Sequence, residues 1–177
     1  PMTVTTTTVR NEYLANGVTI TFPFTFKILD REHLIVSLVD DETGVETGLT
    51  YATDYTITGV GAAVGGSITI ISGAPATGTT VVLRRELDVV QPTDYSNQGR
   101  FYPETHETSF DRLTMLVQQV QDGVDRAIVQ PENGSDWFDA QSRRIINLGD
   151  AIELTDAVNV QTMNEAIGDA LGGVGGY

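Results

Sequence analysis

Hydrophobic and polar positions alternate with a period of two through much of the first half of the chain. In the clearest run, threonines and Pro23 separate a series of large apolar side chains: Val18, Ile20, Phe22, Phe24 and Phe26. This spacing places all of them on one face of an extended strand. Because proline cannot donate a ladder hydrogen bond, we expect the strand to lie at a sheet edge or to break at Pro23.

Short β-rich runs separated by turns continue this pattern as far as Val90. Turn residues lie at 40–44 and in the glycine-rich stretch 59–66. The further strands are predicted over residues 34–39, 55–58, 67–71 and 80–85. Short strands at close spacing predict an antiparallel β-sandwich or small barrel, which we assign to residues 2–90. Residues 91–102 are then interpreted as a linker.

The spacing of apolar positions over residues 103–130 predicts one long helix with a narrow hydrophobic stripe. Pro103 suits the first turn of the helix, and polar residues such as Asp111 and Gln118 fill most of its remaining surface. The stripe has heptad a and d spacing: Phe110, Leu113, Val117, Val120, Val124 and Ala127. It could be buried against the chain's own β-domain or against copies of the same helix, and its β-branched residues permit a trimer.

A second, shorter module is predicted at residues 136–171. Residues 137–148 look extended, and Thr155 offers an N-cap for a helix that continues to Leu171. Residues 172–177 are glycine-rich and are predicted to be flexible. The expected fold class is therefore mainly β with α: an antiparallel sandwich or small barrel, a long coiled-coil-like helix, and a short extended-plus-helix module.

Composition limits the functional classes. The chain has 24 acidic and 10 basic residues and a formal net charge of −14, which argues against binding a nucleic-acid backbone or an anionic membrane surface. It has no cysteine, so neither a disulfide nor a thiolate metal site is possible. A hydrophobic fraction of 40% is typical of a folded protein.

No residue pattern indicates catalysis. His33 and His106 are the two histidines, too few to suggest a transition-metal site. The Gly59–Gly66 stretch is not followed by the lysine and helix of a phosphate-binding loop. We therefore expect no enzyme activity, no catalytic residue, no metal and no cofactor.

The order of several motifs resembles the N-terminal domain of T7-like (podovirus) tail fibre and tailspike proteins. The resemblance covers about residues 3–126. It rests on these segments: 19–26, 33–36, 49–57, 68–70, 73–79, 83–85, 91–95 and 101–119. A second segment, residues 139–148 followed by 155–159, is similar to connector repeats that precede the distal part of phage fibres, although Glu153 and Leu154 stand where a proline often occurs.

The resemblance implies a structural component of the virion tail that anchors a trimeric fibre and connects it to distal receptor-binding or depolymerase parts. The implied partners are two further copies of the chain, the adaptor or nozzle proteins of the tail tube, and a distal fibre or second tailspike. The heptad stripe is then the expected trimer interface. From composition we select candidate tail-docking residues in and beside the linker: Tyr95, Arg100, Phe101 and Tyr102.

Two other roles stay open at this point. The chain could be a glycan-binding adhesin module that touches the host, with Tyr102, Trp137 and Phe138 as an aromatic platform. It could also be the anchor of a longer depolymerase.

Overall fold

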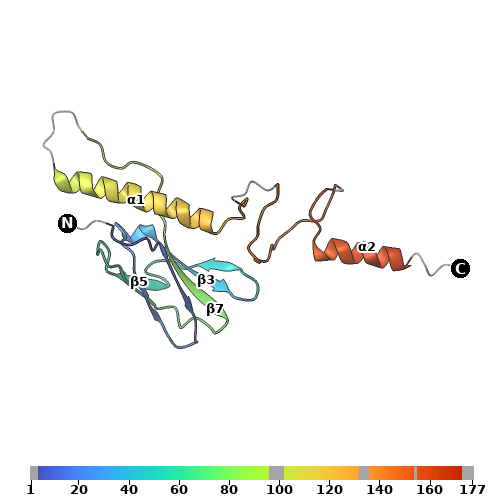
Figure 1. Cartoon of the computed structure of the whole chain (residues 1–177). Coiled ribbons are helices and arrows are strands. Elements are labelled where there is room, and N and C mark those ends of the chain that lie inside the picture. The colour runs from blue at the N-terminus through green and yellow to red at the C-terminus, as the bar shows by residue number, and fades with distance from the viewer. Residues whose placement is uncertain (1–3, 96–101, 132–135, 154, 173–177) are drawn as a thin grey trace. The chain divides into compact units, whose positions relative to one another are not determined.

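The computed structural model describes residues 4–95, 102–131, 136–153 and 155–172. The chain divides into two compact units, Pro1–Arg126 and Ala127–Tyr177. Among the described residues, the first unit holds the strands and the longer helix, α1 (Pro103–Asp125); the second holds α2 (Val160–Gly172) (Figure 1). We describe each unit by itself.

Two antiparallel sheets build the first unit. The four-stranded sheet has the order β1 (Arg10–Leu14), β7 (Thr79–Arg85), β3 (Leu34–Asp40) and β4 (Glu46–Gly48). The three-stranded sheet has the order β2 (Thr21–Phe24), β6 (Gly66–Ile70) and β5 (Tyr55–Thr58). A single turn of 3₁₀ helix, Arg31–His33, precedes β3. The prediction of antiparallel β-structure mixed with helix is confirmed.

The inward side chains of both sheets form one hydrophobic core. Phe22, Phe24 and Ile68 come from the three-stranded sheet, and Val36 and Leu83 face them from the other. All five are at most 3% exposed. The alternation seen in the sequence therefore predicts the buried face of these strands correctly. From here on, residues 4–90 are called the β-domain.

The phenylalanine strand is shorter than the sequence predicts. Only Thr21–Phe24 forms β2, and Val18 and Ile20 are exposed rather than buried. The cause is local: the side chain of Asn16 accepts hydrogen bonds from the backbone N–H groups of Val18 and Thr19, which holds the chain in a turn. The edge position of the strand is confirmed, because β2 is the first strand of its sheet.

The glycine-rich stretch is the hairpin loop between β5 and β6, as predicted. Gly65 has a positive φ of 88°, and a Cβ atom there would lie 2.0 Å from the carbonyl oxygen of Phe24. No other residue fits this position, because the backbone of β2 passes directly over it.

Candidate assembly interface

The helix α1 begins at Pro103, as the sequence predicts. Tyr102 before it is extended, with φ −112° and ψ 107°, and proline suits the first helical position. The helix ends at Asp125, five residues before the predicted end at residue 130. Ala127, the last residue of the predicted stripe, therefore lies beyond the helix, and it belongs to the second unit.

One face of α1 packs on the β-domain, and this face is largely polar. Met115 is fully buried and Asp111 is 5% exposed. Gln118 and Gln119 lie further along the same face and reach the β-domain with their side chains. In heptad terms these residues occupy positions b, c and f, opposite the a and d stripe.

A buried ion pair lies at the centre of this contact. The ammonium group of Lys27 lies 2.7 Å from Oδ2 of Asp111, and both side chains are less than 10% exposed. The other carboxylate oxygen, Oδ1, accepts a hydrogen bond of 3.0 Å from the backbone N–H of Val4. The pair thus joins the N-terminal segment, the β-domain and the helix. Removal of one partner from such a pair is strongly destabilising, since the other charge stays buried.

Arg85, at the end of β7, makes a second polar link. Its guanidinium donates to the carbonyl oxygen of Lys27 (3.0 Å) and to the side-chain oxygen of Gln118 (2.5 Å). It also lies 5.9 Å from the ring centre of Phe26. Burial lowers the pKa of Arg85 to about 10, so the group stays charged at neutral pH and attracts the glutamine oxygen.

Side-chain amides and a guanidinium close the rest of the contact by binding backbone atoms. Gln119 accepts from the N–H of Leu87 (2.8 Å) and donates to its carbonyl oxygen (3.4 Å). Gln118 donates to the carbonyl oxygen of Thr6, and Arg112 donates to that of Asp88. The sequence pattern predicts these polar residues only as the remaining surface of the helix, whereas in the structure they fix α1 in one orientation.

The predicted stripe lies on the opposite, open face of α1. Its described helical members are between 50% and 68% exposed: Phe110, Leu113, Val117, Val120 and Val124. We call these five residues the seam. The structure thus excludes one of the two burial modes left open by the sequence, because the stripe is not packed on the chain's own β-domain.

A groove borders the seam on one side and extends its apolar surface. Its volume is about 370 Å³, and residues 89–93 and Tyr95 line it together with α1. Leu116, which the sequence analysis missed, is half-buried in its wall. At the groove's end, the Tyr95 ring stacks on His106 with 4.8 Å between ring centres, and the Tyr95 hydroxyl shares a hydrogen bond of 2.6 Å with Ser109.

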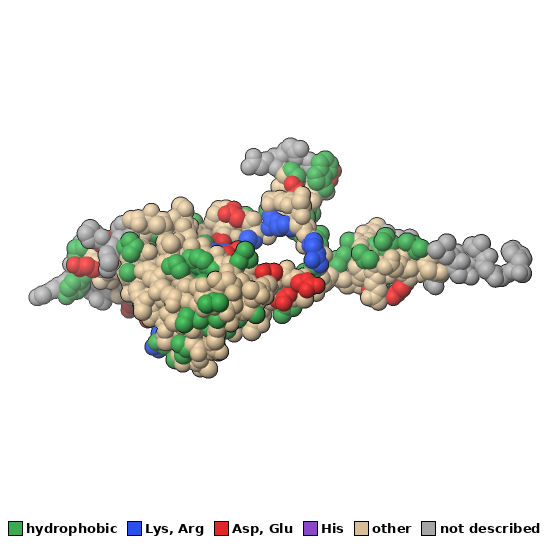
Figure 2. All heavy atoms as spheres, turned by 90° about the horizontal axis from the view of Figure 1, so that it is seen from below, with side chains coloured by type: hydrophobic (Ala, Val, Ile, Leu, Met, Phe, Trp, Pro, Cys, Tyr) green, Lys and Arg blue, Asp and Glu red, His purple; other side chains and the backbone are tan. Residues whose placement is uncertain are grey.

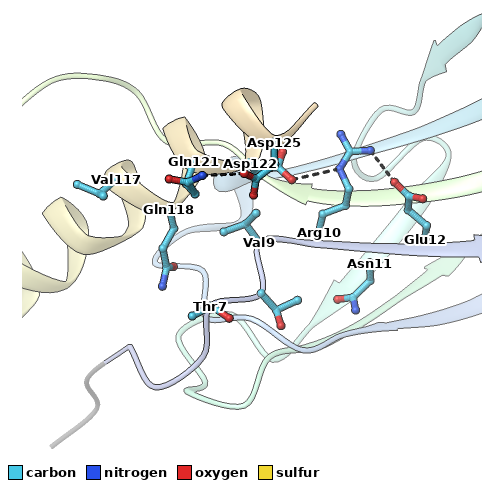
Figure 3. Close-up of a pocket in the computed structure, with 11 residues that line it drawn as sticks. Thr7, Val9, Arg10, Asn11, Glu12, Val117, Gln118, Gln121, Asp122 and Asp125 are labelled. Atoms are coloured by element: carbon cyan, nitrogen blue, oxygen red, sulfur yellow. Dashed lines mark hydrogen bonds and ion pairs between the residues drawn. The ribbon is translucent and has the colours of Figure 1, made fainter. Parts of the chain in front are cut away.

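A larger groove of about 790 Å³ borders the seam near the end of the helix. Figure 3 shows side chains of α1, among them Asp122 and Asp125, facing the segment that carries Val9 and Arg10. Arg10 lies 3.8 Å from Asp122 and 2.8 Å from Glu12. The seam residue Val117 lies at the border of this groove.

The predicted tail-docking residues are only partly described. Tyr95 and Tyr102 are 44% and 57% exposed, but the Tyr95 hydroxyl and ring are already used within the first unit. Arg100 and Phe101 lie outside the described residues. Their role in docking stays a prediction.

The histidines have local structural partners. His33 accepts a hydrogen bond from the N–H of Asp30 at Nδ1 and caps the 3₁₀ turn. Burial and, to a lesser degree, Arg112 lower its pKa. Within the described parts of the chain, no three His, Asp or Glu side chains are arranged to hold a metal ion, and no described helix is long and apolar enough to cross a membrane.

The second unit has no buried residue among those described in it. Its helix α2 begins at Val160 rather than near Thr155, since Asn159 caps it by accepting from the N–H of Thr162 (2.7 Å). The predicted extended segment at 137–148 forms one antiparallel bridge, between Val129 and Asp139. Gly172, the first residue of the predicted flexible tail, is the last residue of α2, and the rest of that tail lies outside the described residues.

Large apolar side chains of this unit are left open. The exposed set includes Trp137, Phe138, Ile145, Ile152, Val160, Met163 and Ile167. A unit of this size in which none of the described residues is buried is not expected to be stable by itself.

Comparison with known proteins relates the chain to the tailspike class of phage tail proteins. It is 42% identical, over 156 residues, to the tail spike protein of Salmonella phage epsilon15. The match covers 88% of this chain and 14% of the length of that tailspike. No family model matches the chain.

This similarity confirms two predictions: the relationship to phage tailspikes and the location in the virion tail. It supports a structural role in the phage tail. The finer assignment, to the N-terminal domain of T7-like fibres, stays a prediction.

Proposed function

We propose that the chain is a non-catalytic anchor of a phage tailspike or tail fibre: three copies associate through the seam, attach to the virion tail and carry distal parts outward. The observation that supports this proposal is the division of α1 into two faces. Its polar face binds the β-domain, and its apolar heptad face is open.

The open seam favours self-association on energetic grounds. A helix on a monomeric domain usually buries its apolar face against that domain, and here the reverse holds. Complete burial of a valine, leucine or phenylalanine side chain contributes roughly 1.5–3 kcal/mol. Exposure of five such residues therefore forfeits several kcal/mol per chain that association would recover.

The composition of the seam supports three copies. In the heptad, Phe110, Val117 and Val124 are at a positions, and Leu113 and Val120 are at d positions. β-Branched residues at both kinds of position relax the preference for a dimer. A threefold assembly would present three β-domains to the tail, and multiple equal contacts raise avidity without strong single contacts.

The coverage of the relative supports the anchoring and connecting role. Because the chain corresponds to 14% of a tailspike, receptor binding or depolymerase activity would belong to the rest of such a protein. The second unit, with its open apolar side chains, would pass the assembly on to those distal parts.

The test is the mass in solution, measured by light scattering. We expect three times the chain mass of 19.1 kDa. The variant Val117→Asp/Val120→Asp should give monomers with the β-structure retained, because it places charges in the seam. A matched control is Val60→Asp/Val64→Asp, which makes the same change at exposed valines of the β5–β6 loop and should keep the assembly. A seam variant that keeps the wild-type mass would refute the role of α1.

A second candidate function is binding of a host glycan, favoured by two adjacent exposed aromatic residues. Trp137 and Phe138 are 63% and 73% exposed, and aromatic faces suit the apolar faces of sugars. A glycan array with the purified chain tests this function. Glycan binding that is lost in Trp137→Ala would support the adhesin role. If the chain binds no glycan, the adhesin role is excluded and the anchoring function remains.

A further inference from the structure

The three-stranded sheet lacks charged side chains. No Asp, Glu, Lys or Arg occurs from Tyr13 to Phe26, which includes β2, or from Tyr55 to Leu83, which includes β5 and β6. The whole chain has a net charge of −14. The acidic surface that keeps such a protein soluble is thus carried by other parts of the molecule.

The outer face of this sheet is a regular array of small polar side chains. Since Phe22, Ile68 and Tyr55 point into the core, the alternate residues point outward. They are Thr21, Pro23, Thr56, Thr58, Ser67 and Thr69, which we call the neutral face. Cross-strand hydrogen bonds join the hydroxyls of Thr21 and Thr69 (3.2 Å) and those of Thr58 and Ser67 (3.0 Å).

The chain's own helix does not cover the neutral face. The hydrogen bonds that join α1 to the β-domain involve residues outside the three strands, such as Lys27, Arg85 and Leu87. The edge-strand residues of the neutral face are exposed, and those on the central strand β6 are half-exposed. Ile71 follows β6 on the same side and is 53% exposed.

The edges of the sheet are less open than its face. At β2, the hydroxyl of Tyr13 donates to the carbonyl oxygen of Pro23, which itself has no N–H to offer. At β5, the carbonyl oxygen of Tyr55 accepts from the N–H of Ala52. A partner would therefore meet the face of this sheet rather than add a strand to it.

The outer face of the four-stranded sheet differs in charge. It carries Arg10, Glu12 and Arg84, with ion pairs from Arg10 to Glu12 and from Arg84 to Glu86. The centre of a protein interface is depleted of charged residues, since removal of a charge from water costs far more than removal of a hydroxyl that finds a new partner. Of the two outer faces, only the neutral face meets this requirement.

Figure 2 shows one face of the molecule, on which apolar side chains lie among uncharged side chains and backbone, and the few acidic side chains in view lie toward the margins of that face.

We propose that the neutral face is the surface by which the chain docks on an uncharged protein surface of the virion tail. This inference rests on the proposed anchoring function. In the proposed assembly, the sister copies contact one another through the seam on α1. The neutral face lies on other elements, the three strands of the smaller sheet. It therefore stays free in each copy for a second kind of partner. Three such faces in one assembly would bind the tail together.

The experiment measures binding of the purified chain to virions that lack their tailspikes. Wild-type chain should bind in a saturable way. The variant Thr21→Lys/Thr56→Lys, which adds charges at two exposed positions of the neutral face, should weaken binding by about tenfold or more. The control Leu14→Lys/Thr47→Lys adds the same charge on exposed strands of the other sheet and should bind within about twofold of wild type.

Each further result has a fixed meaning. Circular dichroism and solution mass show whether a variant is folded and assembled, and Thr56→Glu repeats the test with the opposite charge. Equal binding of wild type and a folded neutral-face variant overturns the inference while the anchoring function stands. Failure of wild-type chain to bind overturns the anchoring function itself. If a neutral-face variant no longer has the mass of three copies, the face contacts sister copies and the inference is overturned. The inference is also overturned if Tyr102→Ala loses binding while the neutral-face variants keep it.

Discussion

Lys27 and Asp111 are 84 positions apart in the sequence, and they form an ion pair of 2.7 Å that is almost completely buried. Lys27 follows the phenylalanine run of the β-domain, and Asp111 lies in the third turn of α1. This pair, with Arg85 and Gln118 beside it, makes the helix a fixed part of the first unit.

Asp111→Asn keeps the shape of the side chain and removes the charge opposite Lys27. We expect the free energy of unfolding to fall by about 3 kcal/mol or more, because the buried Lys27 ammonium loses the carboxylate that lies 2.7 Å from it. Urea denaturation followed by circular dichroism measures the change. Asp122→Asn is the control: its pairs with Arg126 and, at 3.8 Å, with Arg10 are both open to solvent in part, so the loss should stay below about 1 kcal/mol. Equal effects of the two substitutions would contradict the structural role of the buried pair.

Met115→Ala and Leu113→Ala separate the two faces of α1. Met115 is buried against the β-domain, so its truncation should cost about 2–5 kcal/mol of stability at any protein concentration. Leu113 is 59% exposed, and its truncation should act on association, with an effect that depends on protein concentration. Unfolding curves at two concentrations that differ a hundredfold distinguish these outcomes.

His33 should make stability depend on pH. Burial, with Arg112 nearby, lowers its pKa in the folded chain from the ordinary value of 6.5. A lowered histidine pKa means that the unfolded chain binds the proton more readily. The contribution to stability is therefore complete above about pH 6.5 and is lost as the pH falls toward the folded-state pKa. Denaturation midpoints at pH 7.5, 6.5 and 5.5 should decline less in His33→Gln than in wild type, and parallel curves would exclude this histidine as the source.

Gly65→Ala should be more destabilising than Gly61→Ala. Both glycines have positive φ, 88° and 80°, so either substitution has a backbone cost of roughly 1–2 kcal/mol. At Gly65 the added Cβ would also collide with the Phe24 carbonyl, whereas at Gly61 nothing lies within 4 Å. Thermal denaturation should show a clearly lower midpoint for the Gly65 variant, and identical midpoints would mean that the hairpin moves away from β2 at little cost.

Sequence periodicity predicted the interior of the β-domain well. Phe22, Phe24 and Phe26 are buried as the alternation indicates, since a period of two leaves one arrangement that covers them all. It failed at Val18 and Ile20, where the side chain of Asn16 competes for the backbone N–H groups. Hydrophobic patterns do not report such local hydrogen bonds.

For α1, too, the sequence pattern predicts the apolar face but not the contacts of the polar face. The spacing of the seam residues is visible in the sequence, and the structure keeps them on one open face. The sequence of the polar face does not predict that Gln118 and Gln119 bind the β-domain. A glutamine that hydrogen-bonds a distant backbone group looks, in a sequence, like one that faces water.

The polar attachment of α1 determines more than stability. Any assembly built on the seam inherits the angle at which Arg85 and Gln119 hold the helix. In the proposed assembly, substitutions at these contacts would change the orientation of each β-domain on its helix while leaving the seam residues in place. A tailspike with such a substitution could stay fully assembled and still fail to attach to the virion.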